Sequence, residues 1–158
     1  MKIGIIVYSQ TGNTHSIALK IQEALIRKGH NVDIEKIEAI RDPKQPAKDI
    51  KITKIPSVEK YDGIIFASFV EAFCLCPVMD VYLKQIKSIK NKKVAFFVTQ
   101  FFPYPWMGGN HAIKQMEKTC KLEDNDMHIT GVINWKNKKR EEKIKELVEQ
   151  FTNYFDKK

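Results

Sequence analysis

The sequence predicts a three-layer, doubly wound α/β sandwich, in which helices cover both faces of a five-stranded parallel sheet. Short apolar runs rich in β-branched and aromatic residues alternate along the chain with longer segments whose apolar residues recur at helical spacing. Strands that alternate with helices pair in parallel through right-handed crossovers, which place helices on both faces of the sheet. Five such strands favour the order 2-1-3-4-5. We expect residues 1–158 to form one domain.

Five segments are predicted as strands. Four are nearly continuous apolar runs, typical of strands buried on both faces, whereas residues 31–37 alternate through Val32, Ile34 and Ile37, as expected nearer an edge of the sheet. The four apolar runs are residues 2–8, 62–68, 93–99 and 127–135.

Four helices are predicted between and after these strands. The first spans residues 14–28 and ends at Gly29, a residue suited to a helix C-terminus. The others begin at Pro77, at Asn110 as the capping residue of 110–120, and at Lys138 for 138–155. Residues 38–61 contain three prolines, which argue against a full crossover helix, so we expect a short helix or an extended segment there.

Composition limits the classes of function. The chain has 158 residues, a formal charge of +8 and a pI of about 9.3, which raises nucleic acid or an acidic protein as a partner. The lysines are not interleaved with aromatic residues as in a base-stacking surface, so we expect no nucleic-acid partner. Three cysteines in an ordinary composition favour a reducing, cytoplasmic setting, and we expect neither a signal peptide nor a membrane span.

Ligands of open α/β sheets bind at the carboxyl ends of the strands, where the strand order reverses. The first loop there runs directly into a helix, so its backbone N–H groups and three hydroxyls can converge on one phosphate, although an ordinary capped turn has the same composition. This loop lacks the lysine of a P-loop, the glycines of a dinucleotide site, the acidic residues of a receiver domain and the cysteine of a low-molecular-weight phosphatase. It reads Ser9, Gln10, Thr11, Gly12, Asn13, Thr14.

Aromatic residues are concentrated in the two other loops at this edge. They can sandwich a flat aromatic ligand, or instead close the top of the core or form a partner surface. They are Phe69, Phe73, Phe101, Phe102, Tyr104 and Trp106.

The first loop matches the Ser/Thr-x-Thr-Gly-x-Thr pattern of flavodoxins, and the order of elements resembles that family along nearly the whole chain. "YDGIIFASFV" is similar to the flavodoxin third strand and flavin loop, "VAFFVTQFFPYPWMGG" to the fourth strand and its loop, and the undivided last strand to the short-chain type. The resemblance implies non-covalent FMN, with its phosphate at residues 9–14. It implies that the isoalloxazine is flanked by Ser68, Phe69, Val70, Glu71, Ala72 and Phe73, and by Thr99, Gln100, Phe101, Phe102, Tyr104, Trp106, Gly108 and Gly109.

The chain departs from that family in its strongly basic charge and in its flavin loop. Glu71 either tunes the flavin or is an exposed loop carboxylate, whereas Cys74 and Cys76 are expected to pack as small residues rather than act as a redox pair. The four histidines show no metal spacing, and His15 either contacts the phosphate or is simply exposed. We expect no catalytic side chain and no metal.

Three functions remain open. The first is an electron carrier that exchanges electrons with redox partner proteins whose surfaces are acidic. The second is an FMN-dependent NAD(P)H:quinone-type oxidoreductase, because a basic surface attracts nucleotide phosphates. The third is an interaction module without flavin.

Overall fold

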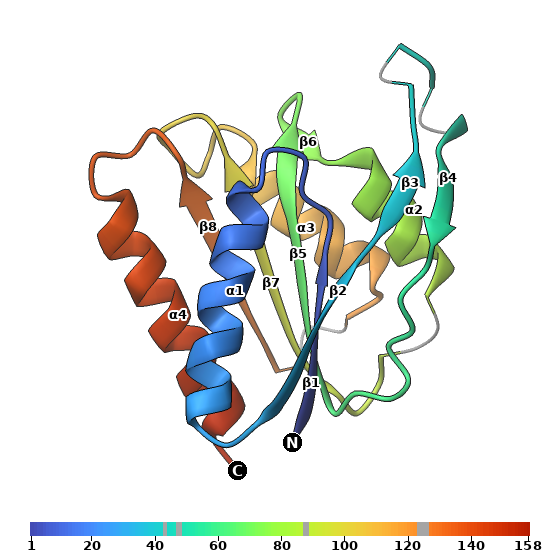
Figure 1. The fold of residues 1–158 in the computed structure, drawn as a ribbon. Helices are drawn as coiled ribbons and strands as arrows, with labels where there is room; N and C mark the ends of the chain where they lie inside the picture. The colour runs from blue at the N-terminus through green and yellow to red at the C-terminus, as the bar shows by residue number, and fades with distance from the viewer. Residues whose placement is uncertain (43, 47–48, 87–88, 123–126) are drawn as a thin grey trace.

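Five parallel strands form the central sheet in the computed structural model, which describes residues 1–42, 44–46, 49–86, 89–122 and 127–158 (Figure 1). Their order is β2-β1-β5-β7-β8, which confirms the predicted order when the parallel strands are counted along the chain. The strands are β1 (Lys2–Val7), β2 (Asn31–Lys36), β5 (Gly63–Glu71), β7 (Lys93–Gln100) and β8 (His128–Asn134). As predicted, the alternating strand β2 lies at an edge.

The helices cover both faces of this sheet. Helices α1 (Asn13–Arg27) and α4 (Arg140–Asp156) pack together on one face, and α2 (Pro77–Gln85) and α3 (Gly109–Thr119) on the other (Figure 1). The prediction that Asn110 caps α3 is wrong, because the cap is Gly108, whose φ of +116° favours glycine. No helix in the described part of the chain combines the length and apolarity that a membrane crossing requires.

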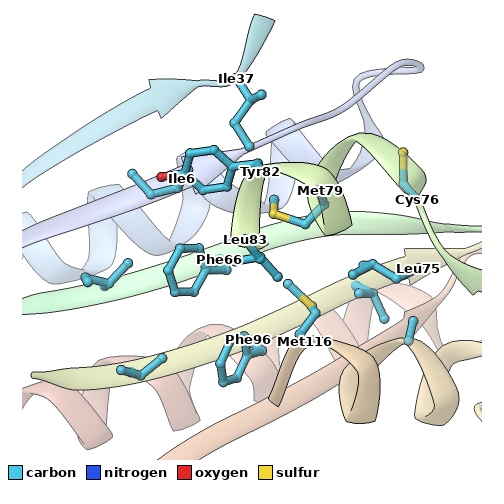
Figure 2. Packing of buried hydrophobic residues seen from close by; sticks show 14 of the residues in the cluster. Ile6, Ile37, Phe66, Leu75, Cys76, Met79, Tyr82, Leu83, Phe96 and Met116 are labelled. Atoms are coloured by element: carbon cyan, nitrogen blue, oxygen red, sulfur yellow. The ribbon is translucent and has the colours of Figure 1, made fainter. Parts of the chain in front are cut away.

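Each face of the sheet has its own apolar core. On the α2 and α3 side, Phe66 and Phe96 stack with centroids 5.7 Å apart, and Met79, Tyr82 and Met116 cover them from the helices (Figure 2). On the α1 and α4 side the core includes Ile5 and Phe97, which are fully buried. The two cores hold the sheet rigidly and so fix the carboxyl ends of its strands.

The connection between β2 and β5 contains an antiparallel ribbon instead of a crossover helix. Strands β3 (Glu38–Ile40) and β4 (Lys51–Lys54) form this ribbon, which lies beside α2 at the right of Figure 1. Tyr82 of α2 donates a hydrogen bond of 2.8 Å to the Pro56 carbonyl and so anchors the return segment. Residues 38–40 and 51–54 therefore confirm the extended alternative, whereas residues 43, 47 and 48 of this connection lie outside the described residues.

Strand β5 continues past its predicted end at Ser68 and turns back as β6 (Cys74–Leu75). The sequence prediction was wrong here, because Phe69 still pairs with Thr99 of β7 and Val70 with Leu75 of β6. The two turn residues, Ala72 and Phe73, have φ values of +49° and +63°. Residues 68–71 of the predicted flavin loop thus belong to strand β5, and Ala72 and Phe73 form the turn of a hairpin.

Candidate functional site

Buried polar contacts join the three predicted loops at the carboxyl edge of the sheet. Thr14 at the start of α1 donates to the Ser68 carbonyl of β5 at 3.2 Å, and its hydroxyl lies 2.8 Å from that of Thr99 in β7. Since the single Thr14 proton goes to the carbonyl, Thr99 donates to Thr14. Thr14 is 1% exposed, so its hydroxyl is committed to these protein groups, whereas its backbone N–H belongs to the first turn of the helix.

The first loop leaves the amino end of α1 open. Gly12 is the N-cap with φ of +86°, and no side chain in the described part of the chain caps this helix. Its first turn also holds no acidic residue. Gln10 and Thr11 are exposed beside it. Uncapped N–H groups and the positive end of the helix dipole together suit an anion.

Three buried polar atoms at this edge have no hydrogen-bond partner among the described residues. They are Ser9 Oγ, Ser68 Oγ and Gln100 Oε1. A buried polar atom without a partner costs about 1–3 kcal/mol, so these atoms suit polar groups of a bound molecule. Together with the open helix end, these two hydroxyls and one amide acceptor fit the phosphate and the polar edge of FMN.

Hydrogen bonds fix the loop that follows β7 to the end of the sheet and to the start of α3. Gln100 Nε2 donates to the Tyr104 carbonyl and to Asn134 Oδ1, and the Asn110 N–H donates to the Pro105 carbonyl at 2.9 Å. A Cβ on Gly108 would lie 2.8 Å from Val70 Cγ1, so glycine lets this loop approach the β5–β6 hairpin closely. This close packing fixes the backbones of the two loops relative to each other.

Five exposed aromatic residues lie on these two loops, and we call them the aromatic surface. The rings of Phe73 and Phe102 stack in parallel, with centroids 5.3 Å apart, and those of Tyr104 and Trp106 stack at 5.9 Å. The fifth, Phe101, is 63% exposed, and the Lys136 ammonium lies 4.7 Å above its ring. These rings do not close the core, unlike Phe69, which is half-buried, stacks on Tyr8 and packs against the core.

Glu71 is not an exposed loop carboxylate, which corrects one sequence-based alternative. It ends β5 and accepts two hydrogen bonds from Arg41, at 2.8 and 2.5 Å. The Arg41 side chain is 12% exposed, and its pKa is raised, chiefly by these bonds. Arg41 follows β3, so this ion pair ties the β3–β4 ribbon to the β5–β6 hairpin. Sequence analysis missed Arg41, although arginine is rare in this lysine-rich chain.

The two cysteines beside the hairpin lie in different environments. Cys74 is exposed, whereas Cys76 is buried at the start of α2, and burial raises the pKa of its thiol to about 11. The Cys76 thiol is therefore protonated at neutral pH and is a poor nucleophile. Among the described residues, no group of histidine, cysteine or acidic side chains could hold a metal ion.

Comparison with solved structures identifies the architecture. Flavodoxin 2 from Bacillus cereus matches with a TM-score of 0.64 and 21% identity, over 97% of this chain and 99% of that chain. The Streptococcus pneumonia TIGR4 flavodoxin matches with a TM-score of 0.63 and 19% identity, over 98% and 97%. This protein has the flavodoxin-like fold.

The same fold also occurs in an enzyme among the matches. An azoreductase from Bacillus anthracis matches with a TM-score of 0.62 and 13% identity, over 98% of each chain. No protein-family model and no curated protein matches the sequence. At these identities the comparisons establish the flavodoxin-like fold, and function has to be argued from the site.

Proposed function

We propose that this protein binds FMN non-covalently and carries electrons. The observation that supports this most is the convergence of an uncapped helix end with two aromatic loops at the point where the strand order reverses. Thr14, Ser68 and Thr99 hold the three segments together there. Flavodoxins and azoreductases share the fold, so flavin chemistry agrees with what this architecture supports elsewhere.

In this proposal the loop of residues 9–14 holds the phosphate. The N–H groups of the first turn of α1, the Thr11 hydroxyl and the unpartnered Ser9 hydroxyl are its donors. Thr14 acts through its backbone N–H and positions the loop through its side chain. Because these donors recognise the phosphate, FMN should bind much more tightly than riboflavin.

In this proposal the isoalloxazine lies against the aromatic surface that the β5–β6 hairpin and the loop after β7 form together, because Phe73 and Phe102 already stack on each other between the two loops. Their exposed rings, with Gln100 Oε1 nearby as an unpartnered acceptor, provide stacking surfaces and a polar contact. Bound flavin supplies one- and two-electron transfer. The residues of the chain bind it, orient it and exclude water from one side, without a catalytic side chain.

Acidic redox proteins are the partners we propose for the carrier. The chain carries a charge of +8, and exposed Lys136, Lys138 and Lys139 follow the carboxyl end of β8, with Lys136 above the Phe101 ring. A basic, aromatic surface attracts an acidic partner and then supplies apolar contact area. The three free thiols favour a cytoplasmic setting for this exchange.

The alternative is an oxidoreductase that takes electrons from NAD(P)H. The structural match to an azoreductase favours this alternative, as does the basic charge, which attracts nucleotide phosphates. Steady-state oxidation of NADH or NADPH distinguishes the carrier from the oxidoreductase. A carrier loaded with FMN shows no oxidation of NADH or NADPH with quinone or dye acceptors, whereas an oxidoreductase consumes them continuously.

Flavin binding itself is tested by titration. Flavin-free protein added to FMN should quench flavin fluorescence to a saturable end point. Protein that quenches neither FMN nor riboflavin would leave an interaction module as the function of this fold.

A further inference from the structure

The ion pair between Arg41 and Glu71 lies beside the proposed flavin site without being part of it. Glu71 is the last residue of β5, and it accepts two hydrogen bonds from Arg41, which follows β3. The Arg41 side chain is 12% exposed and that of Glu71 is 32% exposed. Because a two-bond pair fixes the orientation of both groups, a positive charge is held in direct contact with the Glu71 carboxylate.

This pair is close to the aromatic surface. Glu71 lies two residues before Phe73, whose ring stacks on that of Phe102. Consecutive Cα atoms are about 3.8 Å apart, so the Cα atoms of Glu71 and Phe73 are at most about 8 Å apart. Salt screens exposed charges over a similar length, about 8 Å at physiological ionic strength. A net charge at Glu71 therefore acts on a molecule that is bound at the aromatic surface.

Two further ionisable groups, Tyr8 and Cys76, interact electrostatically with this pair. Burial is the largest cause that raises the pKa of the Tyr8 phenol, and burial raises the pKa of the Cys76 thiol to about 11. Both groups are therefore uncharged at neutral pH. Within this cluster of described residues, the Arg41 charge cancels that of Glu71.

The charge of this cluster matters for a flavin because reduction changes the charge of the ring. Uptake of two electrons and one proton converts the neutral isoalloxazine into an anion, which a nearby carboxylate destabilises and a nearby guanidinium stabilises. We propose that Arg41 is a positioning residue that holds Glu71 and neutralises its charge, so that reduced flavin binds at the aromatic surface without electrostatic repulsion. This role of Arg41 rests on the proposed binding of FMN, and it assigns control of the reduction potential to a residue of the β3–β4 connection.

A purely mechanical role of the ion pair predicts a different result. Arg41→Gln and Glu71→Gln both break the contact, so a mechanical role changes FMN binding in the same direction in the two variants. An electrostatic role changes the preference for reduced over oxidised FMN in opposite directions, because one variant leaves an unpaired carboxylate and the other an unpaired guanidinium. The signs of the two changes therefore distinguish the two roles.

The test measures the dissociation constants of oxidised FMN and of FMN reduced with dithionite, under anaerobic conditions, for the full chain and its variants. The readout is the ratio of the reduced to the oxidised dissociation constant, and the midpoint potential of bound FMN against reference redox dyes gives the same ratio independently. Arg41→Gln should raise this ratio about fivefold, and Glu71→Gln should lower it about fivefold. This is the effect of one charge roughly 8 Å away in a medium between protein and water.

Two further variants keep the charge balance of the cluster. Arg41→Lys retains the positive charge, and the double variant with Arg41→Gln and Glu71→Gln removes both charges, so each should leave the ratio within about twofold of the wild type. The matched controls are Arg27→Gln and Glu23→Gln, which make the same charge changes at an exposed pair on α1. Glu23 lies about 15 Å along α1 from its start at Asn13, so salt screens these charges and the ratio should stay unchanged.

Opposite changes in the two single variants, with return to the wild-type ratio in the double variant, support the proposed role of Arg41. Changes of the same sign, or an unchanged ratio in both single variants while FMN still binds, overturn that role and leave FMN binding intact. If the wild type binds neither oxidised nor reduced FMN, the proposed function fails and the role of Arg41 fails with it.

Discussion

The hydroxyl oxygens of Thr14 and Thr99 lie 2.8 Å apart, although 85 positions separate the two residues in the sequence. With the Ser68 carbonyl, they form a buried polar contact between α1, β5 and β7. This contact holds the end of the loop of residues 9–14, whose Thr-Gly-x-Thr sequence resembles a phosphate site. The two threonines of that loop therefore have different roles, because one faces solvent and the other faces the protein.

Removing the Thr14 hydroxyl should destabilise the protein even without a ligand. Thr14→Val leaves the Ser68 carbonyl and the Thr99 hydroxyl without their shared partner, at about 1–3 kcal/mol of unfolding free energy. Thr11→Val, at an exposed position, should change it by less than about 0.5 kcal/mol. Urea unfolding of flavin-free protein measures both, and equal effects would contradict the structural role of Thr14.

The ion pair between Arg41 and Glu71 should stabilise the β3–β4 ribbon. Arg41→Gln should lower the unfolding free energy by about 1–2 kcal/mol and speed amide hydrogen exchange in β3 and β4, because Glu71 loses both hydrogen bonds. The matched control is Arg27→Gln, whose pair with Glu23 is about two-thirds exposed and should contribute less than about 0.5 kcal/mol. Unchanged amide hydrogen exchange in β3 and β4 of Arg41→Gln would show that the ion pair does not stabilise the ribbon.

The turn between β5 and β6 stores backbone strain. Ala72 has φ of +49°, so Ala72→Gly should raise the unfolding free energy by about 0.5–1 kcal/mol. Ala24→Gly, in the interior of α1, should lower it by about 1 kcal/mol. Opposite signs in thermal or urea unfolding support the turn geometry, and a loss of stability in both variants would refute it.

How far the sequence predicts this molecule depends on the kind of signal. Apolar periodicity predicted the five parallel strands and the four helices of the described residues, because burial on two faces leaves a clear pattern. Apolar periodicity did not predict the β5–β6 hairpin. Residues 69–71 resemble a flavodoxin loop in sequence but continue strand β5, and the turn at Ala72 and Phe73 contains no glycine to mark it. The ribbon pairing was also hidden, because β3 and β4 are short.

Some residues of the candidate site were also predictable from the sequence, and others were not. The sequence motif indicated the first loop. The predicted strand order indicated which other loops lie beside it, because the carboxyl ends of neighbouring parallel strands meet at one edge of the sheet. The contact of Arg41 with Glu71 was missed, since it depends on the path of the ribbon.

A cluster around Glu35 on β2 should make stability depend on pH. Hydrogen bonds from Lys60 and then Tyr61 lower the pKa of Glu35 below its usual value of 4.5. A lowered folded-state pKa stabilises the protein above the unfolded-state pKa, and this contribution is lost as the pH falls through the folded-state value. Glu35→Gln should therefore be less stable than the wild type near neutral pH, with a difference that shrinks in acid. A difference that stays constant with pH would contradict the assignment.

The most direct test of the whole account is a fluorescence titration of flavin-free protein with FMN and riboflavin, repeated for Thr11→Ala. The account predicts saturable quenching, a strong preference for FMN, and a smaller preference in the variant, because loss of the Thr11 hydroxyl weakens FMN binding far more than riboflavin binding. Equal affinity of the wild type for the two flavins would place the phosphate outside residues 9–14. Absence of binding to either flavin would leave the flavodoxin-like fold intact and contradict the proposed function.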